Sequence, residues 1–307
     1  MSSEHVGEYE SGDIRDQITR ILNDLGNPEP PLALPQVREL LRLDLRYYSS
    51  ANTTYVQDVA HRLKVAGKQL LARPTLLLDA IKKANLSALW VPDTKRILID
   101  ETVPELKHRW IEAHEISHSV IPWHHEFLFG DTEYTLDPVC HAIVEAEANY
   151  GAGRLLFLQD RFAQEARDLE PNFKSIKSLA ARYGNTITSA LWRIVEDREP
   201  NQPVFGMVTI HPRHPEIGAI ESGQRVRYFI RSAAFREQFP NVSPNTAFAV
   251  LARYASWNKS GPLVETDHTF QDVNGDVWIF HVESFSNSHA VLTYGCAVGR
   301  KATSVAR

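Results

Sequence analysis

Hydrophobic residues recur at intervals of three and four along several parts of this 307-residue chain, which is the spacing of one buried face of an α-helix. The pattern predicts helices over residues 13–26, 37–43 and 138–157. A Gly-Asn-Pro sequence closes the first of them, and the last begins with Pro138, residue types that are common at those helix ends.

Short runs rich in Val, Ile, Phe, Tyr and Trp predict β-strands in both halves of the chain. Asp93-Thr94 is expected to form a turn between two of them, and Asn274-Gly275 is a strong hairpin signal. Residues 200–203, Pro-Asn-Gln-Pro, have the composition of a linker. The strand segments before this linker are 43–48, 88–92 and 96–99, and those after it are 205–210, 225–231, 276–283 and 290–296.

The composition indicates a folded protein, because 43% of the residues are hydrophobic, 23% are charged and the mean hydropathy is −0.30. Residues 1–20 contain no apolar run, and no stretch approaches the roughly 18 apolar residues of a membrane span. Cys140 and Cys296 fit no metal or redox spacing. The net charge of −5 gives no general attraction for nucleic acid. We therefore expect a cytoplasmic protein that does not associate with membranes.

Residues 114–118, His-Glu-Ile-Ser-His, form the most informative short motif of the chain. Positions i and i+4 lie on one face of a helix, so His114 and His118 could bind a single zinc ion. Glu115 is rotated about 100° from His114, which leaves it beside the metal as a general base. A solvated helix with two surface histidines is the alternative, and the apolar neighbours argue against it. These neighbours are Trp110, Ile111, Ala113, Ile116, Val120 and Ile121.

A hydrolytic zinc site usually has three protein ligands and one open position, and the helix predicted over residues 138–157 offers two carboxylates for the third. Glu145 and Glu147 are about 200° apart around the helix axis, so only one can face the metal. Small residues on the side of Glu145 would allow a close approach to the histidine helix, which favours Glu145. Asn149 is placed one turn further on to hydrogen-bond a ligand histidine. Glu147 remains the alternative ligand.

These segments resemble the ImmA/IrrE family of metallo-endopeptidases. The resemblance is strongest over about residues 105–160 and weaker over 14–198. The chain departs from the family pattern in two places: Ile116-Ser117 stands where Leu-Gly is common, and Gly151 stands where Phe is usual. The segments that carry the resemblance are 30–34, 109–118, 145–149 and 155–156.

The resemblance implies a gluzincin-like endopeptidase in which His114, His118 and Glu145 bind Zn²⁺, with Mn²⁺ as a possible replacement, and Glu115 is the general base. Members of the family typically cut a helix-turn-helix transcriptional repressor, often in the control of phages and mobile elements or in stress responses. The expected partner is therefore a protein substrate of that kind.

The predicted fold class is α+β with three parts. Residues 1–171 would form a zincin-like metallopeptidase domain with a small sheet beside the histidine helix. Residues 172–199 would form a helix-turn-helix-like segment, and residues 200–307 a β-rich C-terminal domain that could sense a signal, as is thought for some relatives. An edge of the small sheet could take up an extended peptide substrate.

The helix-turn-helix-like segment suggests a different function. Apolar positions on either side of Tyr183-Gly184-Asn185 predict two helices joined by a tight turn, and residues 172–198 carry five Lys and Arg against two acids. Two such helices more often pack against a neighbouring domain, since a fold resemblance alone does not establish DNA binding. The alternative hypothesis is a DNA-binding or repressor-sequestering regulator whose metal site is structural or inactive.

Other candidate sites are weaker. Asp272, Asn274 and Asp276 resemble a calcium loop, but Val277 stands where that loop needs glycine. Two further histidines flank a Pro-Arg pair and are expected in a loop. The group that would stabilise an oxyanion stays open. The two loop histidines are His211 and His214. The candidates for stabilising the oxyanion are His124, Tyr134, His141 and Tyr150.

Overall fold

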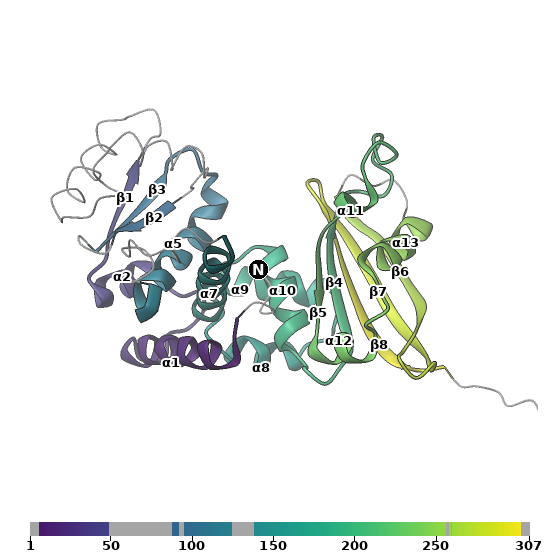
Figure 1. Ribbon diagram of the computed structural model, residues 1–307, viewed down its shortest axis with the longest axis horizontal. Helices are drawn as coiled ribbons and strands as arrows, with labels where there is room; N and C mark the ends of the chain where they lie inside the picture. Colours follow the sequence, from purple (N-terminus) through teal and green to yellow (C-terminus); the bar gives the residue numbers. More distant parts are fainter. Residues whose placement is uncertain are drawn as a thin grey trace, which may run out of the picture. The chain divides into compact units, whose positions relative to one another are not determined.

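Residues 6–48, 88–91, 95–124, 138–255, 258 and 260–301 are described by the computed structural model of this protein. Packing divides the chain into two units, Met1–Gln159 and Asp160–Arg307. Each unit combines helices with a β-sheet, in agreement with the predicted α+β class (Figure 1). The division comes before residue 171, where the sequence suggests that the first domain ends, because the helices after Gln159 pack with one another and with the second sheet.

The first unit contains a three-stranded sheet. β1 (Asp44–Tyr48) runs parallel to β3 (Arg96–Asp100), and β2 (Ala88–Val91) pairs antiparallel with the other side of β3. β1 and β2 are therefore the two edges of the sheet in the described part of the chain. All three strands match predicted segments, whereas the turn predicted at Asp93-Thr94 lies outside the described residues. The helices of this unit are α1 (Glu8–Asp24), α2 (Leu34–Leu41), α5 (Glu105–Val120) and α7 (Pro138–Leu156).

Two helices of the first unit, α1 and α2, begin earlier than predicted. α1 begins at Glu8 rather than at residue 13, and Glu8 and Glu10 lie in its first turn, where acids interact favourably with the helix dipole. α2 begins at Leu34 rather than at residue 37, because Pro35 fits the first helical turn. α7 agrees with its prediction to within one residue.

α5 and α7 pack closely against each other where Ser117 faces Gly151. A Cβ atom placed on Gly151 would lie 2.9 Å from Ser117 Oγ and 3.0 Å from Ser117 Cβ. Ser117 is fully buried, and its Oγ donates a hydrogen bond of 2.8 Å to the carbonyl oxygen of Ala113. The two departures from the ImmA/IrrE pattern thus face each other: a serine fits on α5 because α7 has no side chain at the opposing position.

The second unit contains a five-stranded antiparallel sheet in the order β5-β4-β8-β7-β6. Four of its strands match predicted segments. β6 escapes prediction because its polar and exposed positions give it no continuous apolar run. Gly275 has a φ of 88°, which only glycine adopts easily, and it forms the predicted hairpin turn between β6 and β7. The strands are β4 (Val204–Thr209), β5 (Val226–Arg231), β6 (Ser260–Gln271), β7 (Val277–Asn287) and β8 (Val291–Arg300).

Helices cover both faces of this second sheet. On one face, Phe205 and Met207 of β4 join a core cluster with Phe235 and other residues of the helices that follow β5. On the other face, a Cβ placed on Gly206 would lie 3.0 Å from Val195 Cγ2. Every residue of β4 is therefore buried. The helices of this unit are α8 (Arg161–Arg167), α9 (Phe173–Arg182), α10 (Ile187–Asp197), α11 (Ser222–Arg225), α12 (Ala233–Gln238) and α13 (Pro244–Tyr254).

The two helices predicted on either side of Tyr183-Gly184-Asn185 are present as α9 and α10. Asn172 and Thr186 cap the two helices by accepting hydrogen bonds from the backbone N–H groups of Ser175 and Ser189. Six consecutive residues of α10, from Ala190 to Val195, are buried, and the helix packs against β4, β5 and β8. α10 is thus a structural helix of the second unit.

Residues 200–203 do not form an extended linker. The carbonyl oxygen of Pro200 accepts a hydrogen bond from the N–H of Ala234, and that of Pro203 accepts one from the N–H of Ala297. The segment is therefore held within the second unit.

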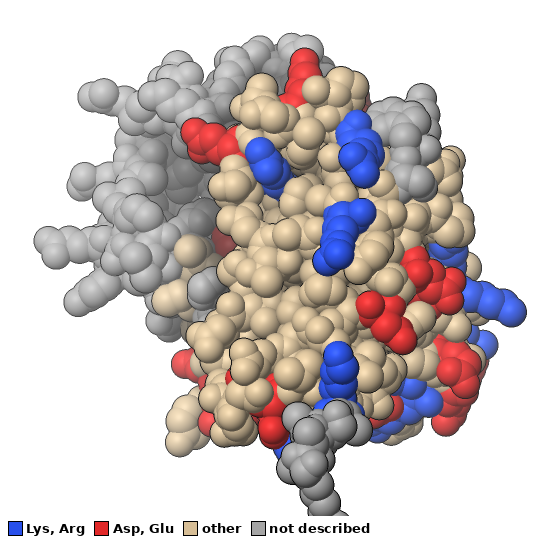
Figure 2. Space-filling view, turned by 90° about the vertical axis from the view of Figure 1, so that its right-hand side faces the viewer, with Lys and Arg blue, Asp and Glu red and all other residues tan. Residues whose placement is uncertain are grey.

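In the described part of the chain, the helices are too short or too polar to span a membrane. The face of the molecule in Figure 2 carries both basic and acidic side chains, together with a large uncharged surface.

Candidate metal centre

α5 and α7 together bring His114, His118 and Glu145 into one cluster. Glu145 Oε2 lies 3.2 Å from His114 Nε2, and Glu145 Oε1 lies 3.5 Å from His118 Nε2. The two Nε2 atoms are 3.1 Å apart. One ligand atom from each of the three residues lies within 4.8 Å of the others. The structure therefore brings together the three candidate ligands that the sequence favours, and Glu145 rather than Glu147 lies in this cluster.

The donor set suits a divalent transition metal. Two imidazole nitrogens and one carboxylate oxygen are ligands that Zn²⁺ prefers, and three protein ligands leave a coordination position for water. The histidines are largely buried, whereas the Glu145 side chain keeps 42% of its surface exposed, so the cluster is reachable from solvent on that side.

Glu115 lies beside this cluster in a buried position. Its carboxylate accepts a hydrogen bond from the backbone N–H of Trp90 on β2. Burial raises the pKa of Glu115 to about 7, and the negative charge of Glu145 acts in the same direction, while His114 and the Trp90 N–H act against it.

The cluster residues influence one another's protonation. Burial lowers the pKa of His118 to about 4. Burial alone would raise the pKa of Glu145, but the hydrogen bonds with His114 and His118 hold it well below its usual range. For His114, the effect of burial is outweighed by the hydrogen bond to Glu145 and the nearby negative charges, so its pKa is raised.

Asn149 lies where the sequence predicts a supporting residue. Its side chain hydrogen-bonds the ring of His114, and its Nδ2 donates a hydrogen bond of 2.8 Å to the carbonyl oxygen of Glu145. Asn149 thus connects two of the three candidate ligands, one on each helix.

A second layer lies behind His118. It contains Glu147, the alternative ligand, His124, one of the oxyanion candidates, and Trp123, which the sequence does not assign to the site. His124 Nδ1 is 2.9 Å from His118 Nδ1, and its Nε2 is 2.8 Å from Glu147 Oε2. Trp123 Nε1 donates a hydrogen bond of 2.6 Å to the same oxygen. No local pattern indicates this arrangement, because α5 and α7 are distant in sequence. The sequence gives one indication of this arrangement: Glu145 and Glu147 both lie on the helix predicted over residues 138–157.

The other predicted candidates do not join the cluster. His124 is enclosed between His118 and Glu147, and Tyr150 is buried beneath the guanidinium of Arg154, 5.0 Å from its ring centroid. Both ring nitrogens of His124 are engaged in these contacts. Tyr134 and the side chain of His141 lie outside the described residues.

The side chains of the two weaker candidate sites form hydrogen bonds within turns and loops. Asp272 Oδ1 accepts hydrogen bonds from the N–H groups of Asn274 and Asp276, so its carboxylate supports the hairpin between β6 and β7. His211 and His214 lie in the predicted loop, where their Nδ1 atoms accept hydrogen bonds from backbone N–H groups two residues further on.

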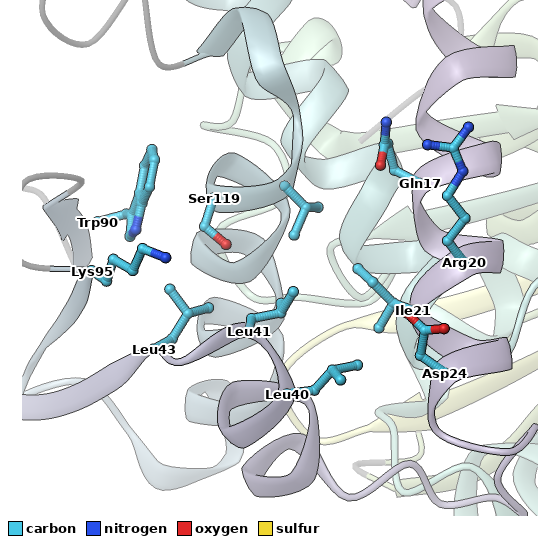
Figure 3. Close-up of a pocket in the computed structure, with 11 residues that line it drawn as sticks. Gln17, Arg20, Ile21, Asp24, Leu40, Leu41, Leu43, Trp90, Lys95 and Ser119 are labelled. Carbon is cyan, nitrogen blue, oxygen red and sulfur yellow. The ribbon is translucent and has the colours of Figure 1, made fainter.

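A groove of about 610 Å³ lies near the candidate centre, between α1, α2, the end of α5 and the sheet (Figure 3). Leu40, Leu41 and Leu43 line one end, while Arg20 and Asp24 lie on α1. Trp90 also lines the groove, although none of the three candidate ligands does. β2 thus contributes a backbone group to Glu115 and a side chain to the groove.

Two imidazoles, a carboxylate and an adjacent buried glutamate define a candidate metal centre within an α+β protein. Comparison with protein-family models and with curated proteins gave no match. Among solved structures, the chain is similar to a Mycobacterium tuberculosis transcriptional regulator, with 15% sequence identity, a TM-score of 0.51, and coverage of 93% of this chain and 88% of that one. This likeness concerns the fold.

Proposed function

We propose that this protein is a zinc-dependent endopeptidase that hydrolyses a peptide bond in a protein substrate. The observation that carries the proposal is the buried carboxylate of Glu115 next to the cluster of His114, His118 and Glu145. A buried acid is costly unless nearby groups compensate for it, and a helix needs no glutamate there for packing. A general base beside a metal explains its presence.

In this proposal His114, His118 and Glu145 hold the metal. The ion would supply Lewis acidity, polarising the scissile carbonyl and making water more acidic. Glu115 accepts the proton of the attacking water and later delivers it to the leaving amine. The N–H of Trp90 keeps the Glu115 carboxylate in place.

The edge strand β2 offers a way to position the substrate. Within the described sheet, β3 pairs with one side of β2, and the Trp90 N–H is bound to Glu115, so a substrate would pair with the remaining backbone groups of the other edge. An extended peptide could add to this edge next to Glu115. We also propose that the first unit is zincin-like. The expected location of the protein is the cytoplasm.

The substrate we propose is a helix-turn-helix transcriptional repressor, on the basis of the resemblance to the ImmA/IrrE family. The similar solved structure is named as a transcriptional regulator, which is compatible with a role in gene control. That name equally fits a second candidate, a regulator that acts without cleavage.

The second candidate would require a surface that binds DNA or a partner protein. The burial of α10 argues against its use as a recognition helix, because such a helix inserts an exposed face into the major groove. The face in Figure 2 shows no continuous basic patch. We therefore favour catalysis.

The decisive experiment combines metal analysis with cleavage. Purified protein loaded with Zn²⁺ or Mn²⁺ is incubated with candidate repressors, and the products are identified by mass spectrometry. Glu115→Gln should abolish cleavage and retain one metal per chain, whereas His114→Ala should lose the metal. Cleavage by Glu115→Gln at the wild-type rate would refute the assigned base. A salt-dependent shift of duplex DNA by the wild-type protein, without cleavage, would favour the regulator.

A further inference from the structure

A continuous chain of hydrogen bonds leads from Glu147 to the back of His118. Glu147 Oε2 is 2.8 Å from His124 Nε2, and His124 Nδ1 is 2.9 Å from His118 Nδ1. His124 is completely buried and Glu147 retains 3% of its surface exposed. The opposite nitrogen of His118, Nε2, faces Glu145 and His114.

The chemistry of these groups gives the chain a direction. An indole N–H is only a donor, so Glu147 Oε2 accepts from Trp123, and an ionised carboxylate accepts from His124 as well. With its proton on Nε2, a neutral His124 presents a lone pair at Nδ1. His118 must then donate from Nδ1, which leaves the lone pair of its Nε2 directed at the cluster.

We propose that His124 and Glu147 are positioning residues for the metal ligand His118. They hold the proton of His118 on Nδ1 and fix the plane of its ring, so that Nε2 is ready to coordinate a cation. This inference rests on the metal centre proposed above. It gives both acids of α7 a role: Glu145 meets His118 from one side as a ligand, and Glu147 acts from the other side through His124.

Burial supports this role over simple packing. A carboxylate and an imidazole in a closed interior are expensive to bury unless their hydrogen bonds are satisfied, and apolar residues would fill the same space at lower cost. The hydrogen bonds from Glu147 to His124 and from His124 to His118 are both short, and the series ends at a candidate metal ligand. Ligand histidines in metal sites commonly donate their second nitrogen to such a partner, which orients the ring.

The test compares variants of the full-length protein. His124→Phe removes the acceptor of His118 and keeps an aromatic ring in the space. Glu147→Gln removes the charge but retains the shape. Trp123→Phe is the matched control, because it deletes another hydrogen bond to the same Glu147 oxygen and leaves the link between His124 and His118 intact. Zn²⁺ affinity is measured by competition with a chromophoric chelator, and the Co²⁺-loaded proteins are compared by their visible absorption bands.

We expect His124→Phe to weaken Zn²⁺ binding about 10- to 100-fold and to alter the Co²⁺ bands. Glu147→Gln should show a smaller loss, because an acceptor remains, while Trp123→Phe should bind as the wild type does. If His124→Phe does not fold, Glu147→Gln decides alone. If His124→Phe and Glu147→Gln, or whichever of them folds, bind Zn²⁺ with wild-type affinity, the positioning role is wrong. The proposed metal centre would not be affected by that result. Wild-type protein that binds no Zn²⁺ would overturn the metal centre itself.

Discussion

The contact between Ser117 and Gly151 leads to a quantitative prediction about the spacing of α5 and α7, the two helices of the candidate metal centre. In Gly151→Ala, the new methyl group would lie 2.9 Å from Ser117 Oγ and 3.0 Å from Ser117 Cβ, closer than carbon and oxygen atoms tolerate. Ser117 Oγ is held by its hydrogen bond to Ala113, and its Cβ is fixed by the backbone of α5. Ile14 Cγ2 on α1, at 3.4 Å, closes the third side.

The expected cost follows from two opposing effects. Overpacking of this kind costs about 1–3 kcal/mol, whereas replacing glycine by alanine inside a helix gains about 1 kcal/mol. Gly151→Ala should therefore lower the free energy of unfolding by up to about 2 kcal/mol. Because the methyl group would push α5 and α7 apart, it should also weaken Zn²⁺ binding by His118 and Glu145.

A double-mutant cycle separates the clash from helix propensity. Ser117→Gly removes both atoms that the methyl group would meet, so the double variant should be more stable than the sum of the single changes predicts, by about 1–3 kcal/mol. Propensity terms cancel in this difference. Stability is measured by urea unfolding of the metal-free protein. The transition of the first unit is identified as the one that added Zn²⁺ shifts. A coupling energy near zero, with Zn²⁺ affinity unchanged in Gly151→Ala, would refute this account of helix spacing.

Three further predictions concern both units. Burial would raise the pKa of Glu165, but hydrogen bonds from Arg182 and Arg161 outweigh it and lower the pKa below 4.5. Its carboxylate therefore stabilises the fold above that pH, and the contribution disappears as the pH falls through the lowered pKa. The stability difference between wild type and Glu165→Gln should shrink between pH 7 and pH 3 in urea titrations, and a constant difference would contradict this. Asp272→Ala removes hydrogen bonds to two backbone N–H groups and to Trp278 Nε1, so it should lower the melting temperature more than Asp276→Asn does. Removal of metal by a chelator should lower the melting temperature of the first unit and stop cleavage, and added Zn²⁺ should restore both; an unchanged melting curve would speak against a metal site there.

Local sequence patterns predict much of the candidate site. The spacing of His114 and His118 is a property of a single helix, and so is the 200° separation that makes Glu145 and Glu147 exclusive as ligands. The three strands of the first sheet and four of the second are also recognisable, since their apolar runs are short and bounded by turns. The boundaries of α1 and α2 are less well predicted, because both helices begin with a first turn that lies before the apolar periodic positions.

The remaining features depend on contacts between segments that are far apart in the chain. The hydrogen bond of His124 with Glu147 forms only when the end of α5 is packed against α7, and no spacing in the sequence encodes it. The same packing shows why Ser117 is compatible with Gly151. In the second unit, the periodicity of α10 is that of any amphipathic helix, and only its burial against the sheet distinguishes a structural helix from a recognition helix.

The sequence by itself determined which chemical groups this protein can present along each helix, because helical periodicity is set by neighbouring residues. Tertiary structure decided which of those groups meet: Glu145 at the imidazoles, Glu147 behind them, and Glu115 against the N–H of Trp90. The physical reason is that side-chain packing and buried hydrogen bonds act between helices and strands. The separation of two residues along the sequence does not determine their distance in space when they belong to different elements.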